Sequence, residues 1–229
     1  YLFAFIEDLD GNKIEISAEL EIVHDRQTKK WPHEPKTLNL WGNAIMRSER
    51  RKFMKYASFV RLGETCFGVF HQGKIFDLTY QLAGGSSSLK EAIHFGSIPD
   101  NIQELESYLA NVTAYDPADI TFLPVIPDPG KIFCIGLNYE KHRKETERPE
   151  VQYPTIFTRF AESQVAHREA VIKPTLSDRV DFEGELAVVI GKGGKNISSE
   201  EALQSIAGYT CYNDVSIRDY QRHTSQFVP

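Results

Sequence analysis

The chain has 229 residues, of which 41% are hydrophobic and 25% charged, an ordinary composition for a globular protein with a core. A formal net charge of -6 argues against nucleic acid or an anionic membrane as partner, because both select for clustered Lys and Arg. There is no bilayer-length apolar run and no signal-peptide pattern, and the three cysteines lie far apart, so we expect a cytoplasmic protein with reduced thiols.

Residues 1–46 are the first of three stretches, and they predict a β-hairpin followed by a polar tail. Two short apolar segments flank Asp10-Gly11-Asn12, which is typical of a tight turn between antiparallel strands. The tail that follows is broken by prolines and has no periodicity. Residues 47–55 are basic and polar, as in a linker.

Residues 47–126 predict a small N-terminal β/α domain. Short apolar segments between residues 56 and 78 alternate with Gly-containing turns, which favours an antiparallel sheet. The Gly-Ser segment that ends at Ser88 predicts a loop and then a helix N-cap, and a second helix is expected over 101–109. Three prolines then indicate an extended connector: Pro124, Pro127 and Pro129.

Residues 127–229 predict a third, mainly β region that carries the chemistry. We expect strands over 132–135, 181–190 and 207–212, and a helix over 200–206. The whole chain is therefore expected to be α+β, mostly β with short helices.

Two carboxylates are the first chemical signal in this region. Glu183 and Glu185 lie two residues apart on a predicted strand, so both side chains point to one face. Backbones two residues apart are separated by roughly 6.6 Å, and two charges at that distance repel by roughly 2.5 kcal/mol at an effective dielectric near 20. A cation between them would turn the repulsion into coordination, and oxygen ligands suit Mg²⁺ or Mn²⁺. The alternative is an edge strand with a solvated acidic face.

A third carboxylate, Asp214, follows the strand predicted over 207–212. Asn213 or Asp214 could instead cap the next helix, which is the ordinary use of these residues. If the segment is helical, Arg218 and Gln221 share the face of Asp214. A carboxylate, a guanidinium and an amide on one face suit a metal-bound oxo acid whose further anionic group is held by the arginine.

His142 and Glu145 are a candidate base pair upstream of the carboxylates. They are three residues apart, so on a helical turn Glu145 can orient the imidazole of His142 for activating a water. Their neighbours are mainly charged, and a solvated helix face is the alternative interpretation.

Four blocks of the chain together resemble the fumarylacetoacetate hydrolase family in order and spacing, over roughly residues 56–229. The blocks are Gly136-Leu137-Asn138-Tyr139 with His142 and Glu145, then Pro154-Thr155-Ile156-Phe157, then Asp181-Phe182-Glu183-Gly184-Glu185-Leu186, then Gly208-Tyr209 with Asn213-Asp214-Val215-Ser216-Ile217-Arg218-Asp219.

The resemblance implies a β-sheet rolled into a compact barrel with flanking short helices, and a homodimer. It implies Mg²⁺ or Mn²⁺ held by Glu183, Glu185 and Asp214, and it makes His142 and Glu145 the base dyad on a loop that orders over substrate. Arg218 and Gln221 match substrate-contacting positions. Arg159 falls where many members carry a lysine and is the third expected substrate-binding residue. The implied activity is on small 2-oxo acids in aromatic catabolism: acylpyruvate C–C hydrolysis, isomerisation or decarboxylation. One mechanism joins these reactions, in which the metal stabilises an enolate while a base moves a proton.

The two ends of the chain depart from the family's pattern. The family continues into a Gly-Lys loop and further strands, whereas this sequence stops at Pro229, so we expect the C-terminal part of the core to be missing.

Residues 1–46 resemble the last hairpin of the vicinal-oxygen-chelate fold, in which Glu15 would be a metal ligand. Glu15 is assigned no role, because the two histidine-bearing strands of such a site are absent from the sequence. A metal-binding but inactive fragment or interaction module is the alternative to an enzyme.

Overall fold

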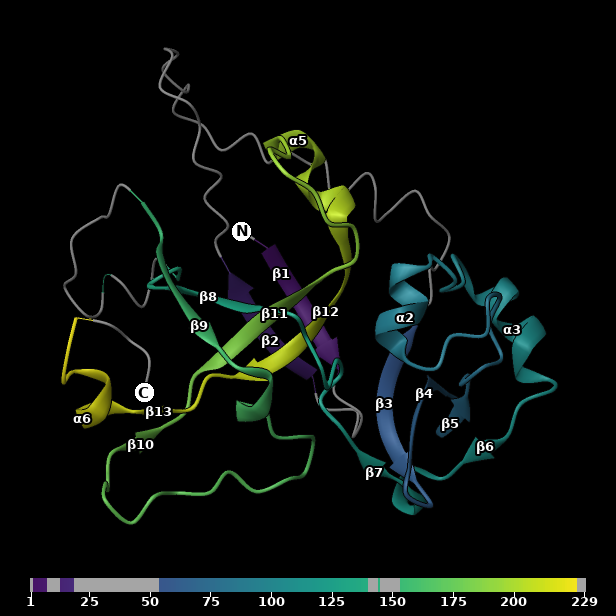
Figure 1. Cartoon of the computed structure of the whole chain (residues 1–229), viewed down its shortest axis with the longest axis horizontal. Helices are drawn as coiled ribbons and strands as arrows, with labels where there is room; N and C mark the ends of the chain where they lie inside the picture. The colour runs from purple at the N-terminus through teal and green to yellow at the C-terminus, as the bar shows by residue number, and fades with distance from the viewer. Residues whose placement is uncertain (1, 8–12, 19–53, 140–143, 145–152, 226–229) are drawn as a thin grey trace.

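The structure, a computed structural model, describes residues 2–7, 13–18, 54–139, 144 and 153–225 (Figure 1). These residues are mostly β with few short helices, as the sequence predicted. The strands of the predicted N-terminal hairpin are confirmed: β1 (Leu2–Glu7) and β2 (Lys13–Ala18) pair antiparallel. The turn at 8–12 and the tail at 19–46 lie outside the described residues, and Glu15 is described only as part of β2.

A five-stranded antiparallel sheet with the strand order β6-β5-β4-β3-β7 forms the lobe on the right of Figure 1. Its strands are β3 (Lys55–Arg61), β4 (Glu64–His71), β5 (Lys74–Asp77), β6 (Ala114–Tyr115) and β7 (Thr121–Phe122). The two hairpins close at Leu62-Gly63 and Gln72-Gly73, where all four residues have positive φ, from 49° to 83°. Such two-residue turns match the right-handed twist of the paired strands, and glycine takes the second position without strain.

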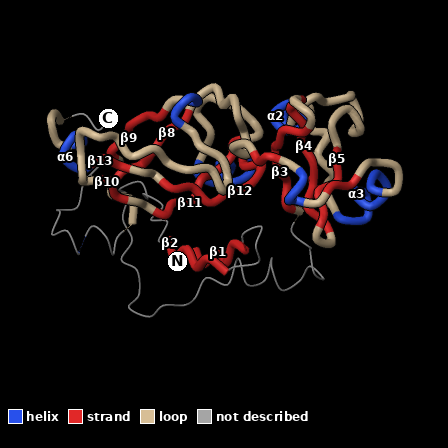
Figure 2. Tube along the Cα trace, turned by 90° about the horizontal axis from the view of Figure 1, so that it is seen from below, coloured by secondary structure: helices blue, strands red, loops and turns tan. Residues whose placement is uncertain are grey.

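Two short helices cover this sheet: α2 (Leu89–His94) and α3 (Ile102–Leu109), with a 3₁₀ turn, η1 (Pro117–Asp119), before β7. Figure 2 shows both helices beside the strands of this lobe. The core beneath them consists of fully buried apolar side chains, among them Phe67, Val69, Leu78 and Leu105. The N-cap of α2 is Ser88, as the sequence predicted. The N-cap of α3 is Asn101, so this helix begins one residue later than the predicted range of 101–109.

The N-terminus of α2 is held by a reciprocal pair of caps. The Ser88 hydroxyl accepts from the amide of Glu91 at 3.2 Å, and the Glu91 carboxylate accepts from the amide and the hydroxyl of Ser87 at 2.8 and 2.7 Å. These hydrogen bonds lower the pKa of Glu91 below its ordinary value of 4.5. The carboxylate is therefore an ionised acceptor at neutral pH.

Because the folded pKa of Glu91 is depressed, its cap should stabilise the fold above the ordinary pKa and lose this effect as pH falls through the folded pKa. We expect Glu91→Gln to lower the free energy of unfolding at neutral pH, and this difference from wild type should shrink as the pH falls and the wild-type carboxylate takes up its proton. Urea unfolding at neutral pH and at a series of acidic pH values measures this. Glu106→Gln, at an exposed glutamate of α3, is the matched control; an equal pH dependence in both variants would contradict the assignment.

The described residues from 132 onward form antiparallel β-ribbons, on the left of Figure 1. One ribbon pairs β8 (Ile132–Gly136) with β9 (Thr155–Arg159), and the other pairs β11 (Gly184–Ile190) with β12 (Ile206–Asn213). A short pair, β10 (Val180–Asp181) with β13 (Ser216–Ile217), lies next to the second ribbon. Small helical turns complete the region: η2 (Ala161–Ser163), α5 (Ser199–Ala202), η3 (Leu203–Ser205) and α6 (Arg218–Gln221).

Two predicted elements here are wrong in extent. The strand expected over 181–190 is broken at Phe182 and Glu183 into β10 and β11. The helix expected over 200–206 ends as α5 at Ala202, and Ile206 already begins β12. The carbonyl of Ser205 accepts from the amides of Gly191 and Lys192, so this segment closes the β11–β12 ribbon and cannot continue a helix.

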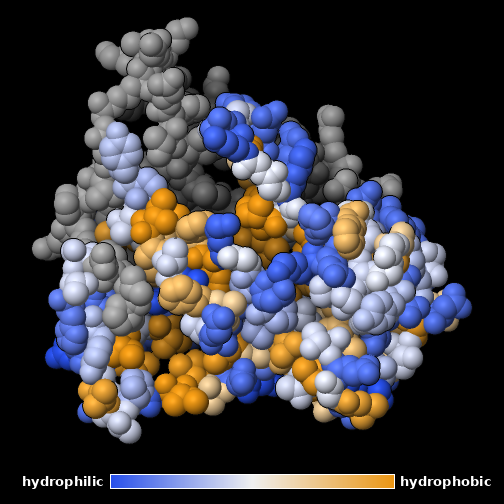
Figure 3. Space-filling view, viewed as in Figure 1, coloured by the Kyte–Doolittle hydropathy of each residue, from blue (hydrophilic) through white to orange (hydrophobic). Residues whose placement is uncertain are grey.

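The ribbons show apolar side chains on their outer faces. Phe133 is 61% exposed and Ile156 58% exposed on β8 and β9, and Val188, Ile190 and Tyr209 are exposed on β11 and β12. Figure 3 shows such side chains at the surface of this half of the molecule. Among the described residues the ribbons are not closed into one barrel, and none of the helices there has the length and apolar character needed to cross a membrane.

Candidate functional site

The break between β10 and β11 does not change the register of the ladder. Val180 lies opposite Ile217 before the break, and Gly184 lies opposite Asn213 after it. Each step along one strand is matched by one step back along the other, so the two pairs belong to a single antiparallel register. Glu183 therefore lies opposite Asp214, and the amide of Asp214 donates to the carbonyl of Glu183 at 2.8 Å.

This register places the predicted metal ligands together. Side chains two apart on a strand, and those directly opposite on its partner, share a face of the ladder. Glu183 and Glu185 thus share a face with Asp214, as predicted for the two glutamates. Asp181 lies two residues before Glu183 and therefore shares this face. The sequence prediction did not include Asp181, although the same two-residue spacing would have indicated it.

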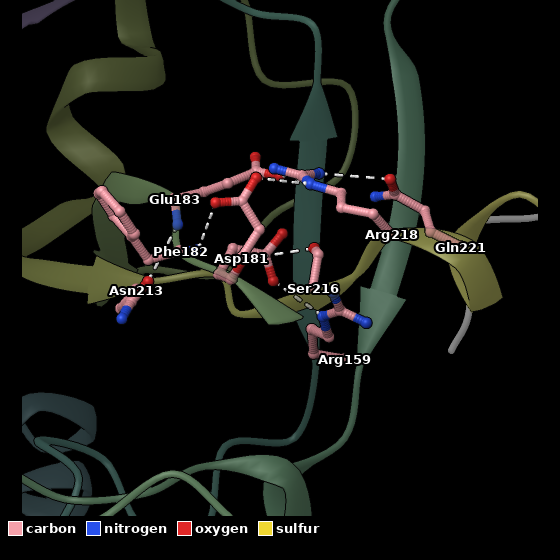
Figure 4. A network of polar contacts seen from close by, with 9 residues as sticks. Arg159, Asp181, Phe182, Glu183, Asn213, Ser216, Arg218 and Gln221 are labelled. Atoms are coloured by element: carbon pink, nitrogen blue, oxygen red, sulfur yellow. Dashed lines mark hydrogen bonds and ion pairs between the residues drawn. The ribbon is translucent and has the colours of Figure 1, made fainter. Parts of the chain in front are cut away.

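Two side chains accept hydrogen bonds from the backbone amides at the break between β10 and β11. The Asn213 amide oxygen accepts from the amide of Glu183 at 3.0 Å, and the Asp181 carboxylate accepts from the amide of Phe182 at 3.0 Å (Figure 4). Asn213 therefore caps the interrupted ladder and not a helix, which was the alternative considered for it. Phe182 is left 77% exposed beside the carboxylates.

Arg159 enters the site from β9 and pairs with Asp214. Its Nε lies 2.9 Å from Asp214 Oδ1, and the two side chains are only 13% and 9% exposed. Arg159 is on the inner face of β9 because inward and outward residues alternate along that strand. The β8–β9 ribbon thus faces the carboxylate ladder and supplies a positive charge to it.

Arg218 and Gln221 lie together at the other side of the carboxylates. Arg218 Nε lies 2.8 Å from Asp181 and its Nη1 lies 2.5 Å from Glu183 and 3.3 Å from Gln221 Oε1 (Figure 4). Burial alone would lower the pKa of Arg218, but its hydrogen bonds to the two carboxylates raise it. The same contact with Arg218 lowers the pKa of Asp181.

The helix expected from Asp214 through Gln221 is wrong. Asp214 precedes β13, and α6 begins only at Arg218. Residues 216–217 pair with β10, and the amide of Arg218 donates to the carbonyl of Arg179 at 2.9 Å, so strand pairing uses the backbone that a helix would need. Arg218 and Gln221 still share a face, because they are three residues apart on α6.

Glu185 is a half-buried carboxylate of this group. Burial raises its pKa, and the nearby charges of Glu183 and Asp214 raise it further, while a hydrogen bond from the Tyr139 hydroxyl opposes the rise. Cys134 on β8 lines the same space: burial, with Asp214 and Glu185 close by, raises the pKa of its thiol to about 11. The site therefore concentrates negative charge in a half-buried place beside an uncharged thiol.

The predicted base dyad, His142 and Glu145, lies outside the described residues. The described chain reaches Tyr139, three residues before the histidine. The Tyr139 hydroxyl accepts from the amide of Leu186 on β11 at 3.4 Å. The segment that carries the dyad therefore starts from a residue attached to the carboxylate ladder.

The donor set fits a divalent cation by its chemistry: Glu183, Glu185 and Asp214 offer hard carboxylate oxygens on one face. The negative charges of these carboxylates repel one another, and a bound cation would reduce that repulsion. In the described residues, however, no group of three or more His, Cys, Asp and Glu side chains is arranged to hold a metal ion. Two of the three carboxylates point to arginines instead, so a bound cation would have to exchange with Arg218 and Arg159.

The class of protein follows from comparison with known families. Residues 131–229, which contain the ribbons and all the site residues, match the family described as fumarylacetoacetate (FAA) hydrolase C-terminal. Over these residues the chain is similar to the fumarylacetoacetate hydrolase family, which confirms the resemblance seen in the sequence for this part of the chain.

Several individual proteins of known name are similar to part of this chain. The chain is 48% identical over 103 residues to a fumarylacetoacetate hydrolase domain-containing protein 2 homolog of Dictyostelium discoideum, matching 44% of this chain and 34% of the relative. It is 45% identical over 104 residues to human oxaloacetate tautomerase FAHD2A, mitochondrial, matching 45% of this chain and 33% of that protein. The Xenopus laevis oxaloacetate tautomerase fahd2, mitochondrial, is 39% identical over 150 residues, or 65% of this chain and 46% of the relative. The chain thus spans less than half the length of these curated relatives.

Solved structures agree on the fold. A fumarylacetoacetate hydrolase from psychrophilic Exiguobacterium antarcticum superimposes with a TM-score of 0.62 at 30% identity, covering 77% of this chain and 61% of that one. The 2-hydroxyhepta-2,4-diene-1,7-dioate isomerase from Mycobacterium marinum gives a TM-score of 0.55 at 25% identity, covering 77% and 60%. The fold is therefore shared with proteins whose names describe both hydrolases and isomerases.

Proposed function

We propose that this chain forms the cation and substrate site of an enzyme that moves a proton next to the carbonyl of a small 2-oxo acid. The observation that carries the proposal is the ladder face on which Glu183, Glu185 and Asp214 lie together, flanked by two arginines. A divalent cation, Mg²⁺ or Mn²⁺, bound there would supply a positive charge against developing negative charge on the substrate oxygens.

The arginines give the substrate class. Arg218 is a forked donor whose present partners are carboxylates, so a carboxylate of the substrate can replace them with the same geometry. Gln221, in contact with Arg218, adds an amide that can donate or accept. Arg159 would remain close to the position of the cation and assist in holding the anionic substrate. Together these side chains orient a molecule with two oxygen-bearing ends.

The reaction proposed is keto–enol interconversion or a related isomerisation, with C–C hydrolysis or decarboxylation as other outcomes of the same site. The relatives named oxaloacetate tautomerase act, by that name, on a 2-oxo acid. His142 and Glu145 are proposed as the groups that take up and return the proton, as the family pattern implies. The proposal extends to a homodimer, in line with the exposed apolar side chains of β8 and β9, and to a place in aromatic catabolism.

The first test is calorimetry of Mg²⁺ binding with and without oxalate, a planar dianion that imitates the enolate of a 2-oxo acid. We expect one Mg²⁺ per chain, bound more tightly when oxalate is present. Glu183→Gln should weaken this binding at least 10-fold, because a ligand and a negative charge are both lost. Asp178→Asn, at a fully exposed aspartate outside the ladder, is the matched control for loss of charge.

Two results would count against the proposal. A folded wild-type chain that binds no Mg²⁺ even with oxalate would remove the cation site. Equal binding in Glu183→Gln and Asp178→Asn would place the cation elsewhere.

An inactive, metal-binding interaction module is the second candidate, and turnover separates it from an enzyme. Oxaloacetate and a panel of acylpyruvates would be assayed for tautomerisation and cleavage with Mg²⁺ present. Mg²⁺ and oxalate binding without turnover of any of them would favour the module.

A further inference from the structure

Asp181 shares the ladder face of Glu183 and Asp214, but the proposed function gives it no part. Its carboxylate makes two contacts at once. Oδ2 accepts from Arg218 Nε at 2.8 Å, and Oδ1 accepts from the backbone amide of Phe182 at 3.0 Å (Figure 4). The carboxylate of Asp181 therefore connects the guanidinium of Arg218 to the backbone at the break in the ladder.

The contacts of Arg218 are divided between two parts of its guanidinium. Asp181 contacts Nε, next to the aliphatic stem, whereas Glu183 and Gln221 contact Nη1 at 2.5 and 3.3 Å. A guanidinium is a rigid plane of five N–H donors, so a contact at Nε fixes the direction of the Nη donors at its end. Because the Asp181 carboxylate is also bound to a backbone amide, the ladder determines where the guanidinium points.

The start of α6 is held in place by contacts that do not use the side chain of Asp181. The amide of Arg218 donates to the carbonyl of Arg179 at 2.9 Å, and the hydroxyl of Ser177 donates to Asp219 Oδ1 at 2.8 Å. The pairing of β10 with β13 is made by the backbone. Loss of the Asp181 carboxylate should therefore change the orientation of the guanidinium and leave the path of the chain unchanged.

We infer that Asp181 is a positioning residue, which holds Arg218 by Nε and so directs its Nη donors toward a carboxylate of the substrate. The inference rests on the proposed function, because it takes Arg218 as the side chain that binds this carboxylate, but it involves no cation. The substrate carboxylate replaces Glu183 at Nη1, and the contact at Nε remains. One carboxylate is exchanged for another, so the net charge around the arginine does not change.

The carboxylate of Asp181 has two opposite effects on a bound anion. As a negative charge it repels the anion, but its side chain is 47% exposed, and exposed charges interact weakly. As a positioning group it fixes the donors, and a misplacement of about 1 Å in a site can lower a rate on the order of 100-fold. Positioning should therefore outweigh repulsion, and removal of the carboxylate should weaken binding.

Asp181→Ala tests this with malonate, a stable dicarboxylate, in excess EDTA, so that no divalent cation takes part. Binding is followed by NMR through the Nε–H signal of Arg218, which is identified by its loss in Arg218→Gln. We expect malonate to shift this signal in wild type and to bind about 10-fold more weakly to Asp181→Ala, because the donors are no longer aligned. The Nε–H should also exchange with water faster in this variant, because its acceptor is gone.

Asp178→Ala is the matched control, since it removes an aspartate that is 97% exposed and paired with Lys173 in the segment before β10. It should bind malonate like wild type. Equal or tighter malonate binding in folded Asp181→Ala would overturn the inference, because repulsion would then be the larger effect. An Asp181→Ala variant that melts earlier but keeps the wild-type affinity and exchange rate would make Asp181 a purely structural residue, and the inference would again be wrong.

The same measurements separate the inference from the proposed cation site. If malonate does not shift the Arg218 signal in wild type, the arginine holds no carboxylate and the inference is wrong, whatever calorimetry shows for Mg²⁺. If a chain that binds no Mg²⁺ still binds malonate, and Asp181→Ala weakens that binding, the inference stands and the cation site is removed.

Asp181→Asn covers the case in which Asp181→Ala does not fold. Asparagine has nearly the same shape, but its single side-chain oxygen cannot accept from both the Phe182 amide and Arg218 Nε as the two carboxylate oxygens do. Malonate should therefore bind more weakly to this variant as well, although one negative charge is gone. Wild-type or tighter binding in folded Asp181→Asn would contradict the positioning role.

Discussion

Replacement of Arg159 by methionine is expected to lower the free energy of unfolding by about 3 kcal/mol, the low end of the range for removing one partner of a buried ion pair. Arg159 and Asp214 are 13% and 9% exposed, so little water can replace the guanidinium. Methionine retains most of the aliphatic stem, which limits the loss of packing. The cost therefore comes mainly from leaving the Asp214 carboxylate without its cation.

A double-mutant cycle checks the cause of this loss. Denaturant unfolding of Arg159→Met, Asp214→Asn and the double variant should show that Asp214→Asn restores much of the stability lost with Arg159→Met, because no buried charge is then left unpaired. Additive losses in the double variant would mean that the two side chains act independently.

Divalent cations give a second check on the same pair. Saturating Mg²⁺ should reduce the destabilisation by Arg159→Met, since a cation that binds the folded state takes over the neutralisation of Asp214. A destabilisation that does not depend on Mg²⁺ would show that the carboxylate is not part of a cation site.

Replacement of Arg218 by glutamine is expected to have two opposite effects on binding. The guanidinium now occupies Glu183 at 2.5 Å, so removing it frees a cation ligand. We expect Mg²⁺ alone to bind about 10-fold more tightly, which corresponds to about 1.4 kcal/mol. Oxalate should then enhance Mg²⁺ binding about 10-fold less than in wild type, because the arginine that would hold the anion is gone.

Arg222→Gln is the control for this second prediction. It removes the same charge four residues further on, at an exposed position just after α6. Calorimetry of Mg²⁺ with and without oxalate on both variants distinguishes a specific exchange from a general change of charge. Equal shifts in the two variants would mean that Arg218 does not compete with the cation.

The part of the site that the sequence predicted depends on local periodicity. Glu183 and Glu185 share a face because the period of a strand is two, and this holds even though the strand is interrupted between Asp181 and Gly184. Asp214 was noted as a third carboxylate after a predicted strand, and its role as a metal ligand came from the family pattern; the ladder accounts for it by pairing it with Glu183. Local spacing was sufficient wherever the relevant contact lies within one strand or one turn.

The remaining features depend on pairing between distant segments. The helix expected from Asp214 was wrong because β13 pairs with β10, some 36 residues earlier, and a single helical period could not reveal this. The partner of Asp214, Arg159, is 55 residues away and was identified as a substrate contact without its ion pair. Tyr139 was part of a quoted motif but had no role, because its contact with β11 exists only in the folded chain. The roles of His142 and Glu145 stay predictions.

The constant register across the ladder break has a consequence for how these sequences can vary. Inserting or deleting one residue between Asp181 and Glu185, or between Asn213 and Ser216, would turn every later side chain of that strand to the opposite face. One carboxylate would then point away from the others whatever its identity. Related chains that keep the site should therefore show invariant lengths in these two segments. The irregular segment between η2 and β10 carries no such requirement and can differ in length from one chain to another.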